Sequence, residues 1–420
     1  MMAPFGSGDP HTSSTRILRH PGATAGIPKE HRNDKGAGTT TERIGIIMNG
    51  VTGRMGRNQH LARSIAAIRH DGGLRADGLV IWPDPVLVGR DQERLRQLAT
   101  EYGIERYSTD LEACLAEEQD AIYFDAQSTL RREQALASAI AAGKHVYCEK
   151  PIATTSAAAL EIAGLAQKAG ICNGAVEDKL FLPGLLKLHE VIKRGFLGRI
   201  LSVRVEFGYW VFEDEVGASQ RPSWNYRQED GGGIVLDMFC HFRYLFDHLF
   251  GGVRSVACMA TTHLPERVDE QGRRYKTTAD DAAYALFELE GGAIAQVNAS
   301  WVVRPYRDDL FVIQVDGTDG SATAGLQRCL VQAAVTTPRF VWNPDLPLQL
   351  DPRIGWTEVP DREPAVNAFR RQWELFLRHV VLGDPFPWDL ADSARGVQLA
   401  ELTLAAVAER RWVAIPETPV

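Results

Sequence analysis

Cysteine is scarce in this chain, and it has neither an excess of basic residues nor long apolar runs. Its six cysteines form no C-x-x-C pair and lack the density of a secreted disulfide scaffold. Acidic residues outnumber basic ones by 54 to 46, and the net charge of −8 argues against nucleic acid as a partner. No apolar run approaches the roughly 18 residues of a membrane-spanning helix. We therefore expect a cytoplasmic protein without nucleic-acid or membrane partners.

The chain length and the composition of the first 42 residues limit the number and the bounds of the domains. At roughly 150 residues per domain, 420 residues suggest two or three domains. Residues 1–42 are rich in Gly, Ser, Thr, Pro and His, follow no helical or strand period, and carry charges of both signs. They predict a disordered extension or a start-site artefact, in preference to a functional arm or a secretory signal.

From residue 43 to about 175, short apolar runs alternate with helical patterns. This alternation is typical of βαβ units, and right-handed crossovers then give an α/β domain with a doubly wound parallel sheet. The expected strands are 43–49, 86–89, 120–125 and 145–148, and the expected helices are 57–69, 92–102, 111–118, 131–142 and 157–169. Residues 71–85 resemble an inserted loop.

The second half of the chain follows a different rhythm. Alternating apolar and polar residues, joined by short glycine-containing turns, predict an α+β domain on a large, mostly antiparallel sheet. The expected strands are 200–212, 254–262, 282–290, 293–303, 310–315 and 328–335, and the expected helices are 185–194, 234–250, 365–381 and 390–410.

The first strand–helix turn has the composition of a phosphate-binding loop. Small residues there let the backbone approach a pyrophosphate, and the following helix N-terminus supplies unpaired N–H groups. The spacing is G-x-x-G-x-x-G, with Thr52 in place of the usual second glycine. The alternative is a tight turn without a ligand. The predicted cofactor-binding residues of this turn are Gly50, Thr52, Gly53, Arg54, Met55 and Gly56.

The end of the second predicted strand bears on the choice of dinucleotide. NAD sites usually carry an acidic residue there, about 20 residues beyond the glycines, to bind the ribose. Here the gap is longer, and Gly89 stands in that position, followed by Arg90 and Asp91. Arg90 can pair with the 2′-phosphate of NADP, whereas Asp91 can serve the ribose of NAD. The sequence favours NADP, with an ordinary solvated Arg90 as the alternative.

Two further segments carry polar residues where ligands bind. Glu149, Lys150 and Pro151 follow the strand at 145–148, so the Lys150 ammonium lies at the carboxyl end of a parallel strand. Further on, three glycines precede a helix on which Asp237 and His241 share one face. Such a pair is a recurring acid/base arrangement, or else a structural tie. No third ligand lies near the pair, so no metal is expected.

Taken in order, the glycine turn, A-G-K-H-V–C-E-K-P at 142–151 and G-G-G–D–H at 231–241 resemble the Gfo/Idh/MocA (glucose–fructose oxidoreductase/inositol dehydrogenase) family. The resemblance covers roughly residues 43–335. It implies a Rossmann domain, a C-terminal open sheet that mediates homo-oligomers, a nicotinamide cofactor, and a sugar, cyclitol or related polyol as substrate. The family's catalytic trio matches Lys150, Asp237 and His241, and Glu149 and Lys150 lie beside the nicotinamide ribose.

These features divide the chain into an extension at 1–42, a Rossmann domain at 43–175 that binds NAD(P), and a substrate-binding and oligomerisation domain at 176–420. Two stretches depart from the family pattern. Gln127 is expected on the nicotinamide side, although the family's usual motif is missing there. Lys179 replaces an arginine that faces the active site, or forms a surface pair with Asp178. In the loop before the glycines, substrate-binding candidates are Trp224, Tyr226 and Arg227, unless the two aromatic residues only anchor the loop.

The predicted function is an NAD(P)-dependent oxidoreductase acting on a carbinol or ketone carbon. His241 is the expected general acid/base, Asp237 orients it, and Lys150 polarises the substrate oxygen. Lys150 is the alternative base if burial lowers its pKa. Competing functions are a glycoside hydrolase or lyase that uses NAD transiently, a non-catalytic dinucleotide sensor, and an imine reductase resembling dihydrodipicolinate reductase.

Overall fold

The computed structural model describes residues 40–214, 221–341, 343–345, 351–362 and 364–417. The extension predicted for residues 1–42 lies outside these ranges except for its last three residues, which begin the first strand. Within the described ranges, no helix is both long and apolar enough to cross a lipid bilayer.

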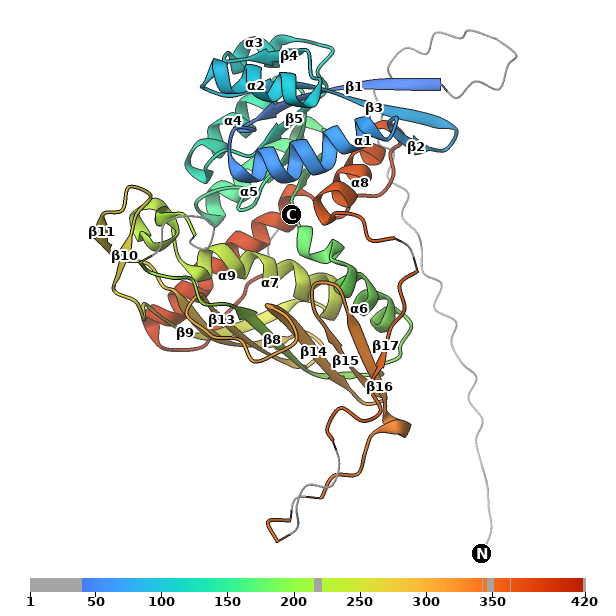
Figure 1. Ribbon diagram of the computed structural model, residues 1–420, viewed down its shortest axis with the longest axis vertical. Helices are drawn as coiled ribbons and strands as arrows, with labels where there is room; N and C mark the ends of the chain where they lie inside the picture. The colour runs from blue at the N-terminus through green and yellow to red at the C-terminus, as the bar shows by residue number, and fades with distance from the viewer. Residues whose placement is uncertain (1–39, 215–220, 342, 346–350, 363, 418–420) are drawn as a thin grey trace, which may run out of the picture. The chain divides into compact units, whose positions relative to one another are not determined.

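A parallel sheet forms the first half of the fold (Figure 1). Its central strand β1 (Thr40–Asn49) lies between β3 (Leu79–Val88) and β5 (Ile122–Asp125), and the sheet continues through β6 (His145–Cys148) to β7 (Asn173–Ala175). On β1, Ile46 and Met48 enter one hydrophobic core and Ile47 enters the other. Both faces of this sheet are therefore buried, as the near-continuous apolar run predicts.

Helices cover both faces of the parallel sheet. They are η1 (Gly56–Ala66), a π-helix that continues into α1 (Ala67–His70), and α2 (Gln92–Tyr102), α3 (Leu111–Ala116), α4 (Thr129–Ala141) and α5 (Ser156–Ala169). Side chains cap three of them: Asp91, Asp110 and Thr155 each accept from a backbone N–H of the first turn. The predicted doubly wound domain is confirmed.

The prediction of an inserted loop at residues 71–85 is wrong, because most of these residues form a β-hairpin. β2 (Leu74–Ala76) pairs antiparallel with the start of β3, while β4 (Arg106–Ser108) pairs parallel with its end. Two prolines, Pro83 and Pro85, lie within β3, and proline is rare inside strands, so the sequence pattern did not predict a strand there. They fall between those two pairings, where no described strand on that edge requires their missing N–H groups.

The second sheet is large and mostly antiparallel, as predicted. Among the described residues its strands follow the order β17-β16-β15-β14-β8-β13-β12-β9-β18, and only β8 and β13 run parallel. Their bounds are β8 (Ile200–Gly208), β9 (Val253–Thr261), β12 (Ala282–Leu289), β13 (Ile294–Ser300), β14 (Phe311–Gly317), β15 (Gly320–Ala324), β16 (Cys329–Ala333), β17 (Thr357–Glu358) and β18 (Val413–Ala414). A short hairpin of β10 (Glu266–Val268) and β11 (Arg274–Lys276) was not predicted.

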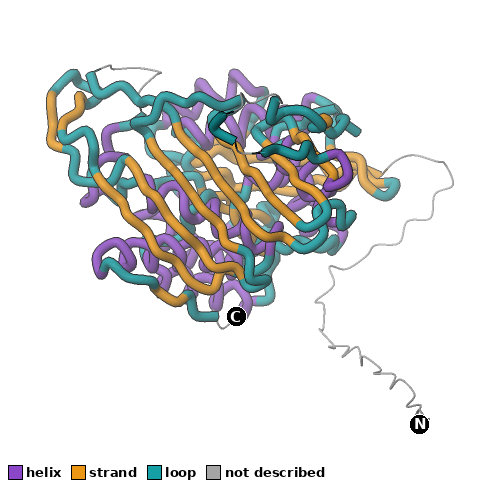
Figure 2. The backbone as a smooth tube through the Cα atoms, turned by 90° about the horizontal axis from the view of Figure 1, so that it is seen from below, coloured by secondary structure: helices purple, strands orange, loops and turns teal. Residues whose placement is uncertain are grey.

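One face of this sheet carries helices and the other is open. The core between sheet and helices includes α6 (Pro183–Lys193) and α7 (Ile234–Phe250), which lie on the side of the parallel sheet (Figure 1). Figure 2 looks onto the opposite face, where the strands lie side by side in front of the helices. That open face exposes large apolar side chains: Met259, Tyr284, Leu286 and Ile294.

The last two long helices join the halves of the fold. α8 (Ala368–Leu382) packs on η1 and places Trp373 and Phe376 in a core of the parallel sheet. α9 (Leu390–Glu409) contacts both α5 and α7. The end of the chain therefore packs against both halves of the fold.

Candidate active site

The turn after β1 accepts only glycine at its key positions. Gly50 has φ 85°, and a Cβ there would lie 2.7 Å from the carbonyl carbon of Ala126. A Cβ on Gly56 would lie 2.5 Å from the Gly50 oxygen. No side chain caps the N-terminus of η1 directly behind the turn. The turn therefore offers free main-chain donors at a close approach, which fits the pyrophosphate of a dinucleotide.

The surroundings of the turn agree with this fit. β1 lies between β3 and β5, where the strand order changes direction and open α/β sheets bind their ligands. The remaining predicted residues of the turn are accessible to a ligand: Gly53 and Arg54 are exposed, and Thr52 and Met55 are half-buried.

Arg90 and Asp91 differ in whether their side chains already have partners within the protein. Asp91 caps α2, because its carboxylate accepts from the Arg94 N–H at 3.1 Å. Arg90 is exposed just beyond β3, and no described residue forms an ion pair or hydrogen bond with its side chain. Of the two, Arg90 is the freer to meet a ligand.

Gln127 and Glu149 are both fixed by neighbours at the ends of their strands. The backbone N–H and side-chain amide of Gln127 donate to Asp125 at 3.0 and 2.8 Å. Asp125 is fully buried and also pairs with Arg132 at 3.0 Å. Glu149 is buried at the end of β6, with one carboxylate oxygen 2.9 Å from His60 Nε2.

Lys150 and Asp237 meet across the two halves of the fold. Lys150 Nζ donates to Asp237 Oδ1 at 3.0 Å and to the Asp237 carbonyl oxygen at 2.8 Å. The other carboxylate oxygen of Asp237 accepts from Arg221. The peptide bond between Lys150 and Pro151 is cis.

These charges determine the ionisation of the pair. Burial raises the pKa of Asp237, but the positive charges of Lys150 and Arg221 outweigh it and hold this pKa well below its ordinary value. Burial likewise lowers the pKa of Lys150, but the Asp237 carboxylate outweighs it and raises this pKa above its ordinary value. At neutral pH the site therefore holds an ammonium and a carboxylate.

His241 is buried on α7, one helical turn beyond Asp237. Its Nδ1 lies 2.6 Å from the Tyr244 hydroxyl and 3.9 Å from an oxygen of Asp178. Burial, followed by the positive charges of Lys150 and Lys179, lowers the pKa of His241 well below its ordinary value. The imidazole is therefore neutral at neutral pH.

The predicted orientation of His241 by Asp237 is wrong. Both carboxylate oxygens of Asp237 already have partners, Lys150 and Arg221. Tyr244 is the residue that holds the imidazole. An i, i+4 spacing places two side chains on one face of a helix but does not decide their partners. The cations of Lys150 and Arg221 are stronger partners for a carboxylate than a neutral ring.

Arg221 is a site residue that the sequence did not reveal. Its guanidinium lies over the Trp301 ring, 4.3 Å from the centroid. Tyr226 packs edge-on against Trp301, and the two ring centroids are 5.2 Å apart. The only sequence signal was an arginine at the start of a loop containing Trp and Tyr. Its partner Trp301, 80 residues further along the chain, has no local signature.

Tyr226 is therefore not a substrate contact, contrary to its prediction. Its surface is fully buried, and the Arg267 guanidinium covers its other side at 3.9 Å from the ring centroid. Arg227 also points to a structural partner: it lies over the Tyr275 ring at 4.4 Å and pairs with Asp230 at 3.8 Å. The loop is anchored by these residues, which was the alternative interpretation for Tyr226.

Lys179 and Trp224 remain substrate-binding candidates. Lys179 Nζ donates to Asp178 at 2.6 Å, so the predicted pair with Asp178 forms. Asp178 in turn faces His241, so Lys179 belongs to the charged surroundings of the site as well. Trp224 exposes 48% of its surface and is free to meet a ligand by its ring face.

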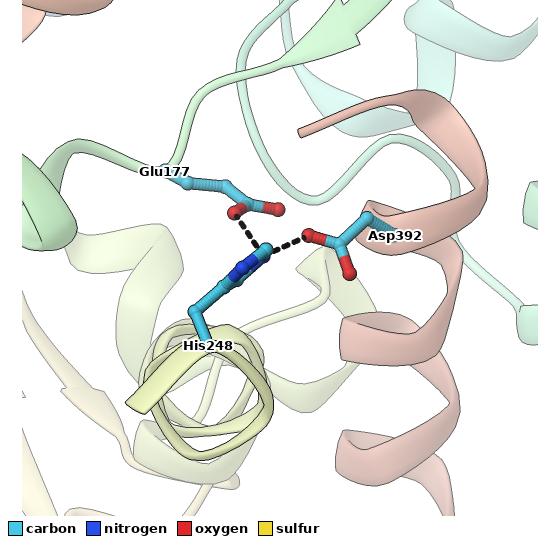
Figure 3. A group of neighbouring side chains, drawn as sticks. All are labelled: Glu177, His248 and Asp392. Atoms are coloured by element: carbon cyan, nitrogen blue, oxygen red, sulfur yellow. Dashed lines mark hydrogen bonds and ion pairs between the residues drawn. The ribbon is translucent and has the colours of Figure 1, made fainter. Parts of the chain in front are cut away.

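A separate cluster behind the site contains three side chains of the types that can bind a metal ion. Glu177, His248 and Asp392 come from the loop after β7, from α7 and from α9, and point toward one another (Figure 3). His248 Nε2 lies 2.7 Å from Asp392 and 3.7 Å from Glu177. Burial, and next the charge of Asp392, raise the pKa of Glu177 well above its ordinary value. The raised pKa favours the protonated, uncharged form of Glu177, and Arg395 pairs with Asp392.

Comparison with known proteins agrees with the fold and the cofactor turn. The family described as an oxidoreductase family with an NAD-binding Rossmann fold matches residues 44–174, and the GFO/IDH/MocA C-terminal domain matches residues 185–323. The chain is 51% identical over 384 residues to the D-xylose dehydrogenase of Paenarthrobacter nicotinovorans, covering 90% of this chain and 99% of that protein.

More distant proteins share the same architecture. The 1,5-anhydro-D-fructose reductase of Ensifer adhaerens is 33% identical over 340 residues, covering 80% of this chain and 94% of the reductase. A levoglucosan dehydrogenase solved in complex with NADH and levoglucosan superposes with a TM-score of 0.74 at 19% identity, covering 90% of this chain and 100% of that one. The family and fold class predicted from the motifs are confirmed: this chain belongs to the Gfo/Idh/MocA family and is an oxidoreductase with an NAD-binding Rossmann domain.

Proposed function

We propose that this enzyme is an NAD(P)-dependent sugar dehydrogenase that oxidises a hydroxyl-bearing carbon of a neutral aldose. D-xylose is the first candidate, because the relative of that name is 51% identical across nearly the whole chain. The observation that carries the proposal is the meeting of Lys150, Asp237 and Arg221 beside a neutral, buried His241. Such a cluster supplies both a proton acceptor and a positive charge for the substrate oxygen.

Lys150 is the residue that stabilises the substrate oxygen. An ammonium has three donors, and Asp237 accepts from two different positions. One donor is therefore left for the oxygen on which negative charge develops. Because Asp237 raises the pKa of Lys150, the group is charged at neutral pH, which supports this role over that of a base.

His241 takes the proton of the substrate hydroxyl. Its Nδ1 is engaged by Tyr244, and no described residue forms a hydrogen bond with Nε2. The neutral imidazole can accept a proton at Nε2, and the cations that lower its pKa favour returning that proton. When bound, the nicotinamide supplies the hydride-accepting carbon. Asp237 and Arg221 position Lys150 rather than His241.

Arg90 supports tighter binding of NADP than of NAD. Its exposed guanidinium is free of described partners beyond the end of β3, whereas Asp91 is committed to capping α2. A guanidinium pairs bidentately with a phosphate, and only NADP carries the 2′-phosphate. Glu149 and Gln127 are the proposed contacts on the nicotinamide side.

The open face of the second sheet is the proposed surface of a homo-oligomer. Apolar side chains on neighbouring strands gather there, and Met259 and Tyr284 lie directly opposite each other on β9 and β12. We also propose a cytoplasmic location, which is supported by six cysteines that form no disulfide.

The function is tested by incubating the purified protein with each dinucleotide and a panel of aldoses, cyclitols and polyols. Absorbance near 340 nm and product analysis follow the reaction. Production of NAD(P)H with D-xylose or another neutral aldose supports the proposal. Cleavage of a glycosidic bond without net NAD(P)H would replace it with a hydrolase or lyase, and dinucleotide binding without turnover of any substrate would replace it with a sensor.

A further inference from the structure

His60 lies at the centre of a buried chain of three side chains behind the cofactor turn. It belongs to η1, the helix that begins at the glycine turn, and none of its surface is exposed. Trp373 Nε1, from α8, lies 3.0 Å from His60 Nδ1, and Glu149 Oε1 lies 2.9 Å from His60 Nε2. The chain joins segments that are 313 and 89 residues apart from His60.

The chemistry of the indole fixes which nitrogen of His60 carries the proton. An indole N–H can only donate, so His60 Nδ1 must accept. The proton of the neutral imidazole then sits on Nε2, which donates to Glu149. The ring itself is held between Phe124 and Phe369, with centroid distances of 4.4 and 5.2 Å.

Glu149 receives that hydrogen bond as a carboxylate. Burial raises its pKa, but the hydrogen bond from His60 and the positive charge of Lys150 outweigh burial, so that this pKa lies below its ordinary value. The second oxygen of Glu149 accepts from the backbone N–H of Lys150 at 3.2 Å. The orientation of Glu149 is therefore linked to the backbone from which the Lys150 side chain starts.

We propose that Trp373 and His60 are positioning residues for the cofactor: Trp373 selects the Nε2–H form of His60, and His60 holds Glu149 as an oriented carboxylate acceptor for a hydroxyl of the bound dinucleotide. The role of the cofactor rests on the proposed function, but the proton position does not. α8 thus contributes to the Rossmann half a contact that neither the glycine turn nor the strand ends provide.

The proton position can be read directly from the resting enzyme. In protein labelled with ¹⁵N only at histidine, we expect His60 to show a protonated Nε2 and an unprotonated Nδ1, with the signal assigned by its loss in His60→Gln. A proton on Nδ1 in the unmodified enzyme overturns the proposal without any further variant.

The variant Trp373→Phe separates this role from packing, because it keeps an aromatic ring and removes only the N–H donor. We expect the His60 signals to shift toward a mixture of tautomers and the Kd for NAD(P)H, measured by fluorescence titration, to rise about tenfold, the size of one lost hydrogen bond to a charged network. Trp412→Phe, at a side chain 46% exposed on the surface, is the matched control and should change neither quantity.

His60→Gln is the conservative variant that should preserve cofactor affinity. A carboxamide offers one acceptor and one donor at the spacing of the two ring nitrogens, so it should keep most of the cofactor affinity. His60→Leu, which offers neither, should lose it. Unchanged tautomer and affinity in Trp373→Phe, or equal losses in His60→Gln and His60→Leu, would leave a packing role only. If the sugar panel is inactive while the tautomer and affinity results hold, the proposed function fails and this inference stands.

Discussion

Lys150 Nζ and Asp237 Oδ1 are 3.0 Å apart although 87 residues separate them in the sequence. Lys150 follows a strand of the parallel sheet, whereas Asp237 lies in the first turn of the helix that packs on the antiparallel sheet. Their ion pair therefore crosses from one half of the fold to the other. Because each charge shifts the other's pKa, the ionisation of the site depends on the two halves remaining in contact.

Asp237→Asn should lower the pKa of Lys150 and with it the upper pH limit of activity. The Asp237 carboxylate is the main group that raises this pKa; without it, burial disfavours the ammonium. Activity that needs a charged Lys150 is present below its pKa and is lost above it, so the alkaline limb of the kcat/KM profile should move to lower pH. An alkaline limb that stays in place would show that Lys150 does not act as the charged group.

His241→Ala should lower turnover by about 10²–10⁴-fold, the usual contribution of a general base. Cofactor affinity should change little, because the proposed pyrophosphate site is the glycine turn and not His241. The pKa of His241 lies well below its ordinary value, so the neutral base is lost only at acid pH, and oxidation should remain active through pH 6.5. Near-normal turnover in His241→Ala would end the assignment of His241 as the general base.

Tyr244→Phe, which removes only the hydroxyl beside His241 Nδ1, should lower turnover less than His241→Ala does.

The fold was predictable from sequence where local patterns decide it. Apolar runs alternating with helical periods determine the parallel sheet, and the helix at 234–250 was predicted with its observed bounds. β3 was predicted only over its last residues, since Pro83 and Pro85 are rare within strands and tolerated here by the gap between its edge partners.

The site was predictable only where the residues carry a motif. Lys150 and Asp237 form an ion pair and His241 lies one helical turn beyond Asp237, but which side chains pair with one another does not follow from their spacing. Tyr226 had the chemistry of a sugar contact, and only the packing of Trp301 and Arg267 around it reveals that it is buried. Contacts of this kind join distant segments and leave no periodicity in either one.

Arg221→Gln should lower kcat/KM by about 10–100-fold, because it removes a charge-assisted bond to Asp237 and the cation over Trp301. Asp237 would then hold Lys150 less firmly. Arg227→Gln is the matched control, since Arg227 comes from the same loop but pairs with Asp230. Steady-state kinetics of both variants check the prediction; equal losses would indicate that the loop as a whole, and not Arg221, is responsible.

Arg90→Ala should raise the Kd for NADPH by about tenfold and leave that for NADH nearly unchanged, because only NADPH presents a 2′-phosphate to the guanidinium. Fluorescence titration with each cofactor gives the ratio. Arg94→Ala, one turn along α2 and exposed like Arg90, controls for a general loss of positive charge. Equal effects on both cofactors would remove the basis for preferring NADP.

Charges placed on the open sheet face should dissociate the proposed oligomer. Met259 and Leu286 expose 76% and 43% of their surfaces on neighbouring strands, and a contact between copies would bury them. A carboxylate buried there without a partner opposes association, so Met259→Glu combined with Leu286→Glu should reduce the mass measured by light scattering to about that of one chain. Leu130→Glu, on α4 and 73% exposed, adds a charge away from this sheet and should leave the mass unchanged. The surface assignment fails if the unmodified enzyme already has the mass of one chain, or if the double variant keeps the unmodified mass.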